Sequence, residues 1–138
     1  MKHRNLLLML PMLLFSFCKK DKTRDSMLQN IGPEKPLTIV YDFTGCFNMG
    51  SETITIKQSG NGYAYTLKRK DTTLQGSFTK QDEIRYAAFE RAGKKLSSQI
   101  NCTTVSDFNL KCGSKEIYFR DGNCAFPEWG EFYQGLNK

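Results

Sequence analysis

Residues 51–78 read SETITIKQSGNGYAYTLKRKDTTLQGSF, and this stretch decides the fold class. Its first eight residues alternate in polarity, with Ile54 and Ile56 on one face, which is typical of a half-buried strand. The pair Asn61-Gly62 predicts a tight hairpin turn, because both residues tolerate the positive φ that such turns require. With that turn Ile56 lies opposite Leu67, so one face of the pair is apolar, as a sheet with one buried face requires.

A second turn at Lys70-Asp71 extends this hairpin by one strand. It places Leu67 opposite Leu74, again on the apolar face. The three strands therefore form an antiparallel meander. Before them, residues 37–43 are rich in β-branched and aromatic side chains, which predicts an opening strand.

The main helix is predicted to begin after Thr79, a favourable N-cap residue. Its predicted apolar stripe consists of Ile84, Ala88, Phe89, Ala92 and Leu96. A glycine at position 93 disfavours the helix interior, so we expect the helix to end there or to continue loosely to Ser98.

A second hairpin and a short helix follow. Strands over 103–111 and 115–120 share a turn at Gly113-Ser114, which places apolar residues opposite each other: Leu110 with Ile117 and Phe108 with Phe119. Over 126–136, aromatic residues recur at helical intervals and predict a core-facing C-terminal helix. The predicted fold is α+β: an antiparallel sheet, made of a three-stranded meander plus a disulfide-locked hairpin, packed with one main helix and a short C-terminal helix.

The N-terminus predicts export. Residues 1–17 are a basic pentapeptide followed by twelve uncharged, mostly apolar residues. As a helix those twelve would span about 18 Å, well short of the roughly 30 Å of hydrocarbon in a bilayer, so a signal peptide is favoured. A strongly charged run begins immediately after Cys18.

The stretch Leu14-Phe15-Ser16-Phe17-Cys18 resembles a bacterial lipoprotein signal. The resemblance implies that Cys18 becomes the first mature residue and carries acyl chains, although Phe17 stands where a small residue is usual. The charged run that follows is similar to the export tails of Bacteroidetes-type lipoproteins. An ordinary secreted protein and an uncleaved anchor are the alternatives. We expect a lipid-anchored flexible tether over 18–36 and a single domain over 37–138.

Composition and charge narrow the function classes. Of the 138 residues, 39% are hydrophobic and 25% are charged, which is typical of one globular domain. Without Lys2 and Arg4 the chain keeps 18 basic and 14 acidic residues, a modest net charge of +4. Basic and aromatic residues do not alternate in the manner of a nucleic-acid-binding fold, so no nucleic-acid partner is expected.

The residue inventory argues against catalysis. The only histidine is His3, inside the predicted signal peptide, so the mature chain has no imidazole for a nucleophilic pair or a metal site. Carboxylates are the remaining candidates for catalysis, and the four considered do not form a recognisable catalytic arrangement. They are Asp42, Asp107, Asp121 and Glu128. We therefore expect a protein without enzymatic activity, metal or cofactor.

Four cysteines remain after Cys18, an even number in an exported chain, and they predict two disulfides. Cys102 and Cys112 bracket one strand and would lie roughly 30 Å apart, far beyond the reach of a disulfide. Cys112 lies at the hairpin turn and Cys124 at its open end, which excludes that pair too. The remaining connectivity is Cys102–Cys124 with Cys46–Cys112.

The segment Gly45-Cys46-Phe47-Asn48-Met49-Gly50 is the candidate binding loop. Phe47, Asn48 and Met49 would sit on a loop held by a disulfide, where apolar anchors lose little conformational entropy on binding. In the alternative interpretation, Phe47 and Met49 fold back and cap the core.

The domain resembles the small cysteine-containing domains of Bacteroidetes-type lipoproteins of unknown function. The resemblance is carried by Gly45-Cys46-Phe47, Cys102-Thr103-Thr104 and Asp121-Gly122-Asn123-Cys124. We expect a cell-envelope protein, in the outer membrane, that touches the membrane through its anchor and binds a protein partner. The alternatives are an inhibitor or immunity protein against a secreted hydrolase or toxin, and a passive structural component of the envelope.

Overall fold

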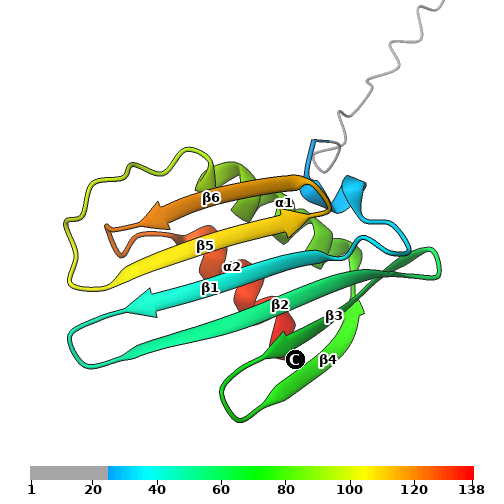
Figure 1. Cartoon of the computed structure of the whole chain (residues 1–138), viewed down its shortest axis with the longest axis horizontal. Helices are drawn as coiled ribbons and strands as arrows, with labels where there is room; N and C mark the ends of the chain where they lie inside the picture. The colour runs from blue at the N-terminus through cyan, green and yellow to red at the C-terminus, as the bar shows by residue number, and fades with distance from the viewer. Residues whose placement is uncertain (1–24) are drawn as a thin grey trace, which may run out of the picture.

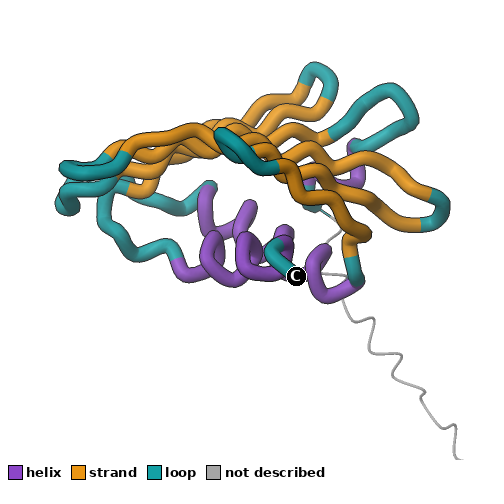
Figure 2. The backbone as a smooth tube through the Cα atoms, turned by 90° about the horizontal axis from the view of Figure 1, so that it is seen from below, coloured by secondary structure: helices purple, strands orange, loops and turns teal. Residues whose placement is uncertain are grey.

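The computed structural model describes residues 25–138, which form one antiparallel sheet with both α-helices on the same face (Figure 2). The predicted signal peptide and Cys18 lie outside the described residues. None of the helices between residues 25 and 138 is long and apolar enough to cross a bilayer. In chain order the elements are η1 (Met27–Asn30), β1 (Leu37–Thr44), β2 (Met49–Ser59), β3 (Gly62–Lys68), β4 (Thr73–Phe78), α1 (Lys80–Gly93), β5 (Val105–Cys112), β6 (Lys115–Asp121) and α2 (Pro127–Leu136).

The α+β class is confirmed, but the sheet is larger than predicted. It has six strands in the order β4-β3-β2-β1-β5-β6 (Figure 1). The opening strand β1 joins the meander on one side and pairs with β5 on the other, from Leu37 opposite Cys112 to Thr44 opposite Val105. The second hairpin is therefore an extension of the same sheet and not a separate unit.

The register agrees with the sequence at two turns and differs at one. Leu67 lies opposite Leu74, and Leu110 lies opposite Ile117, as predicted. In the first hairpin Ile56 lies opposite Tyr65, two positions from the predicted partner. The turn is formed by residues 60 and 61, with the positive φ of 57° at Gly60. Because side chains alternate with a period of two, this shift leaves the buried face unchanged.

The core fills the space between the sheet and the two helices. Thr79 caps α1 through a capping box with Asp82, as the sequence predicts for the helix start. Phe89 is fully buried, but Ile84 of the predicted stripe is 40% exposed and Tyr86 is buried in its place. The aromatic stripe of α2 is confirmed, and Phe132 stacks on Phe89 with ring centroids 5.4 Å apart.

The domain begins earlier than predicted. Met27 and Leu28 fall inside the predicted tether, yet their exposed fractions are only 3% and 1%. The Met27 N–H donates to Oε2 of Glu90 at 2.8 Å, and the Tyr63 hydroxyl donates to the Leu28 carbonyl at 3.2 Å. The boundary predicted at residue 37 is therefore wrong, because two apolar residues in a polar segment are enough to dock η1 onto the core.

Candidate functional site: the loop between β1 and β2

The loop between β1 and β2 projects its apolar side chains into solvent. Phe47 is 103% exposed and Met49 is 75% exposed, relative to the full accessibility of each residue type. The loop is nevertheless closed tightly, because the Gly45 N–H donates to the Asn48 carbonyl at 2.7 Å and Thr44 pairs with Met49. The fold-back interpretation is wrong, since neither side chain caps the core.

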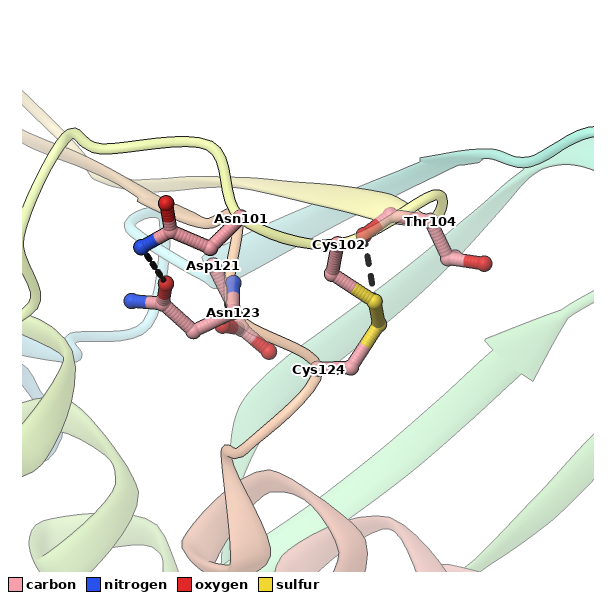
Figure 3. The surroundings of a disulfide bond; sticks show 6 residues. All are labelled: Asn101, Cys102, Thr104, Asp121, Asn123 and Cys124. Carbon is pink, nitrogen blue, oxygen red and sulfur yellow. Dashed lines mark hydrogen bonds between the residues drawn. A yellow bond between two sulfur atoms is a disulfide. The ribbon is translucent and has the colours of Figure 1, made fainter.

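A neighbouring disulfide supports the base of this loop. The predicted bond between Cys102 and Cys124 is present, with Cα atoms 5.8 Å apart (Figure 3). The Sγ atom of Cys124 lies 3.5 Å from the carbonyl oxygen of Thr104. Thr104 in turn lies against Gly45, where an added Cβ would come 3.0 Å from the Thr104 Oγ1 atom. The disulfide therefore holds the segment on which the loop rests.

Hydrogen bonds reinforce the same junction. The Asn101 N–H donates to the Gly122 carbonyl at 2.8 Å, and the Asn101 side chain donates to Oδ1 of Asn123 at 2.8 Å (Figure 3). Cys124 has a φ of 55°, an unfavourable conformation for a residue with a Cβ atom. These bonds and the disulfide together hold the backbone in that conformation.

An aromatic group stiffens the β1 side of the loop. The Phe43 ring covers Gly50 so closely that an added Cβ would come 2.5 Å from its Cζ atom. Phe43 contacts Tyr41 with centroids 5.2 Å apart, and Tyr41 contacts Trp129 of α2 at 4.7 Å. Phe47 and Met49 thus extend from a base that is packed against the C-terminal helix.

Sequence reasoning missed a third exposed apolar residue at this end of the sheet. Ile100 is 57% exposed. It precedes Asn101, whose backbone bonds to Gly122 beside the disulfide. A single isoleucine in a polar connection carries no periodicity, so no sequence pattern singles it out.

The second predicted disulfide is wrong. Cys46 and Cys112 are free thiols, the first exposed and the second buried. Cys112 lies opposite Leu37 at the start of β1, whereas Cys46 follows the last residue of β1. About seven residue steps of strand separate the two ends, roughly 23 Å, which no disulfide spans. The Cys112 Sγ donates to the Lys35 carbonyl at 3.7 Å, and burial raises the pKa of its thiol.

Of the four carboxylates considered from sequence, the structure brings Asp42 and Asp107 together and leaves Glu128 apart from them. Asp42 and Asp107 lie opposite each other on the sheet face that carries no helix, while Asp121 is buried and accepts from the Asn123 N–H at 2.9 Å. The Arg120 guanidinium donates to both oxygens of Asp107 at 2.6 and 3.0 Å and holds the pKa of that carboxyl below its usual value. Glu128 lies apart, in the first turn of α2.

Two buried carboxylates that the sequence did not reveal have structural partners. Glu90 accepts from Met27 and pairs with Lys94 at 2.5 Å. Burial raises the pKa of Asp82, but hydrogen bonds from Thr79 and Lys138 outweigh it, so the pKa lies below its usual value. Near Asp82, a shallow polar depression is lined by Gln81, Arg85, Glu131, Gln134, Gly135 and Lys138. Among residues 25–138, no group of three or more His, Cys, Asp or Glu side chains is arranged to hold a metal ion.

Comparisons of the chain with protein-family models, with curated proteins and with solved structures find no match.

Proposed function

We propose that this chain is a lipid-anchored protein of the cell envelope, in the outer membrane, whose domain is a non-enzymatic binding module. The proposed contact site is the loop between β1 and β2, with Phe47, Asn48 and Met49 as its contact residues. The observation that carries the proposal is the full exposure of Phe47 and the 75% exposure of Met49 on a loop that is closed by its own backbone.

Exposed apolar side chains on a stiff support favour binding on energetic grounds. Burying a Phe or Met side chain contributes about 1.5–3 kcal/mol, so the pair offers roughly 3–6 kcal/mol to a complex. A loop whose base rests on a disulfide-held segment and on packed rings loses little conformational entropy when it binds. This combination favours recognition by an apolar cleft of a protein partner.

Binding is preferred to catalysis because of the chemistry that the chain offers. The sole histidine, His3, precedes the domain, so no imidazole is available to activate the exposed Cys46 thiol. The second free thiol, Cys112, is buried. Of the carboxylates discussed above, Asp107, Asp82 and Glu90 are engaged by basic side chains of the domain itself.

The anchor is proposed from Cys18 and the charged run that follows it. Labelling of producing cells with radioactive palmitate should mark the protein and should fail for a Cys18→Ala variant. Equal labelling of that variant, together with its retention in the membrane fraction, would show that Cys18 is not the acylated residue.

An inhibitor or immunity protein is the second candidate, and the projecting loop favours it because a narrow apolar loop fits a cleft of a hydrolase or toxin. The net charge of +4 without Lys2 and Arg4 argues against a basic target such as lysozyme, because like charges repel across an interface. A passive envelope component would need no exposed apolar loop.

A pull-down with the full chain against envelope and culture-medium fractions tests the binding proposal. A Phe47→Ala, Met49→Ala double variant should lose the partner, with at least a tenfold lower yield. The matched control is Ile84→Ala, which also removes an exposed apolar side chain but on α1. Equal yields from the double variant and the wild type would remove this loop from the proposed site.

A further inference from the structure

β6 forms one edge of the sheet, and part of its backbone has no strand beside it. Among residues 25–138 this strand pairs with β5 alone (Figure 1). The two-residue turn at Gly113-Ser114 makes Cys112 and Lys115 a hydrogen-bonded pair, and such pairs recur at every second residue of an antiparallel ladder. The residues between them therefore point their backbone N–H and C=O groups out of the sheet edge; they are Glu116, Tyr118 and Arg120.

The side chains of these three residues lie on the face of the sheet that carries no helix. Tyr118 is 57% exposed and is one of the five exposed large hydrophobic residues between residues 25 and 138. On the opposite face Phe119 is buried against α1, where an added Cβ at Gly93 would come 2.3 Å from its Cζ atom. β6 thus combines a fixed inner face with an open edge and an exposed ring, and an unpaired edge is a template for a further strand.

The connection between α1 and β5 covers this edge only beyond the end of β6. The Asn101 N–H donates to the Gly122 carbonyl at 2.8 Å, and an added Cβ at Gly122 would come 2.5 Å from the carbonyl oxygen of Gln99. Gly122 lies one residue past Asp121, where the strand ends. The seven residues of β6 itself are therefore open to an added strand.

The sequence of β6 is complementary to its own reverse. It reads KEIYFRD, with Tyr118 at its centre. In an antiparallel pair centred there, Tyr118 lies opposite Tyr118 of a second copy, and each Glu116 lies opposite an Arg120. The remaining opposed positions are Ile117 with Phe119 and Lys115 with Asp121. Opposite charges and aromatic pairs stabilise directly opposed positions, and this register places no like charges opposite each other.

Glu116 and Arg120 can make this contact without giving up the bonds they already make. Arg120 binds Asp107 through two of its three guanidinium nitrogens, Nε and Nη2. Glu116 accepts from the Asn109 side chain with Oε1, one of its two carboxylate oxygens. Each group has a further atom with which to bind the opposite charge of a second copy.

The other edge strand, β4, has no comparable pattern. Its sequence TLQGSF contains no charged residue. Its exposed side chains are small or uncharged: Thr73, Gln75 and Ser77. A strand added to β4 would find nothing in these side chains that selects one register over another.

We infer that two copies of this chain pair through β6, antiparallel and centred on Tyr118, in a twofold-symmetric dimer with one continuous sheet. In this register all the outward backbone groups of Glu116, Tyr118 and Arg120 gain partners in both copies. The second copy is favoured over a strand of another protein because the charge pattern of β6 matches its own reverse. The dimer requires neither the lipid anchor nor the loop between β1 and β2.

Cysteine crosslinking of the purified full chain tests the symmetry and the register. Tyr118→Cys is introduced in a Cys46→Ser background, which removes an exposed thiol. Hydrogen-bonded opposed residues have Cα atoms about 5.5 Å apart, within reach of a disulfide, so mild copper-catalysed oxidation should give a covalent dimer on a non-reducing gel. Crosslinking from position 118 that is absent, or no stronger than from the two control positions below, would overturn the inference.

Two control positions in the same background sharpen this test. Glu116→Cys should crosslink poorly, because position 116 would lie four residue steps, roughly 13 Å, from position 116 of the second copy. Gln75→Cys, on the exposed edge of β4, measures crosslinking by random collision. Position 118 should exceed both.

Charge reversal tests what selects the second copy. Glu116→Arg in the Tyr118→Cys chain should lower the dimer yield by about fivefold or more, because it sets two like charges opposite each other at both ends of the pair. Glu131→Arg is the matched control, since it makes the same change at an exposed carboxylate on α2. An unchanged yield with Glu116→Arg, or an equal fall with Glu131→Arg, would overturn the inference.

Discussion

At one end of the sheet the apolar residues of a short peripheral segment are buried, and at the other end they are exposed. At one end the short η1 segment buries Met27 and Leu28 almost completely, with Glu90 and Tyr63 binding its backbone. At the other end Phe47 and Met49 remain in solvent, on a loop whose backbone closes from Gly45 to Asn48. The core therefore buries apolar side chains of a short segment at one end, whereas the tightly closed loop between β1 and β2 leaves its apolar side chains in solvent at the other.

The largest expected effect lies at the buried end. Leu28→Ala should lower the free energy of unfolding by about 2–5 kcal/mol, because it removes a fully buried side chain and leaves a cavity. Urea denaturation followed by circular dichroism measures the change. A loss below about 0.5 kcal/mol, the range of surface substitutions, would mean that η1 does not belong to the folded domain.

The disulfide should have a somewhat smaller effect. Cys102 and Cys124 are 22 positions apart, and closing a loop of that length stabilises a domain by about 3 kcal/mol in the chain-entropy model. A Cys102→Ser, Cys124→Ser variant should lose stability by that amount and should also show faster hydrogen exchange of the Gly45 amide, which donates to the Asn48 carbonyl. Cys46→Ser is the matched control and should change neither quantity; if its loss equals that of the disulfide variant, the assignment of Cys46 as a free thiol is wrong.

Alkaline pH should loosen the contact between α2 and the loop end. Burial, and then the hydrogen bond that Tyr133 donates to Glu52, raise the pKa of Tyr133 from 10.0 to about 12. The folded state therefore favours the neutral phenol, and this contribution is complete below pH 10 and is lost between pH 10 and 12.

Thermal denaturation across that range should show a fall in stability that is shallower for Tyr133→Phe. The fall should not vanish, because the pKa values of Tyr63 and Tyr65 are also raised, mainly by burial. An unchanged slope in the variant would show that Tyr133 titrates alike in the folded and unfolded states.

The smallest effect on stability is expected at the exposed end. The Phe47→Ala, Met49→Ala variant should change the free energy of unfolding by less than about 0.5 kcal/mol, in contrast to Leu28→Ala. The same denaturation experiment provides the comparison. A loss of several kcal/mol would place both side chains in the core and would remove the difference between the two ends.

Much of the fold could be predicted because its signals are local. The turn between β3 and β4 and the turn at Gly113 set their registers through neighbouring residues, and both registers are confirmed. The pairing of β1 with β5 is different, because about sixty residues separate the strands and no local pattern encodes which edge they share. The apolar stripe of α1 was only partly right, since Ile84 and Tyr86 both suit a buried face and packing alone selects the tyrosine.

The residues of the candidate site could be predicted from the sequence, but the contacts that support the loop could be predicted only in part. The composition of residues 45–50 identified the loop, but exposure depends on how tightly the backbone closes, which sequence does not specify. The prediction of a Cys46–Cys112 bond was wrong because it assumed that every cysteine after Cys18 forms a disulfide. The structure places these two cysteines at opposite ends of β1. The supporting bond is Cys102–Cys124, which acts on the loop through Thr104.

Site-specific photo-crosslinking in producing cells tests the central claim most directly. A photoreactive phenylalanine analogue replaces Phe47 in the full chain, and the matched position is Ile84, which is also exposed but lies on α1. The account predicts a discrete protein adduct from position 47 that is absent from position 84. No adduct from position 47, or the same adducts from both positions, would contradict a binding site at this loop.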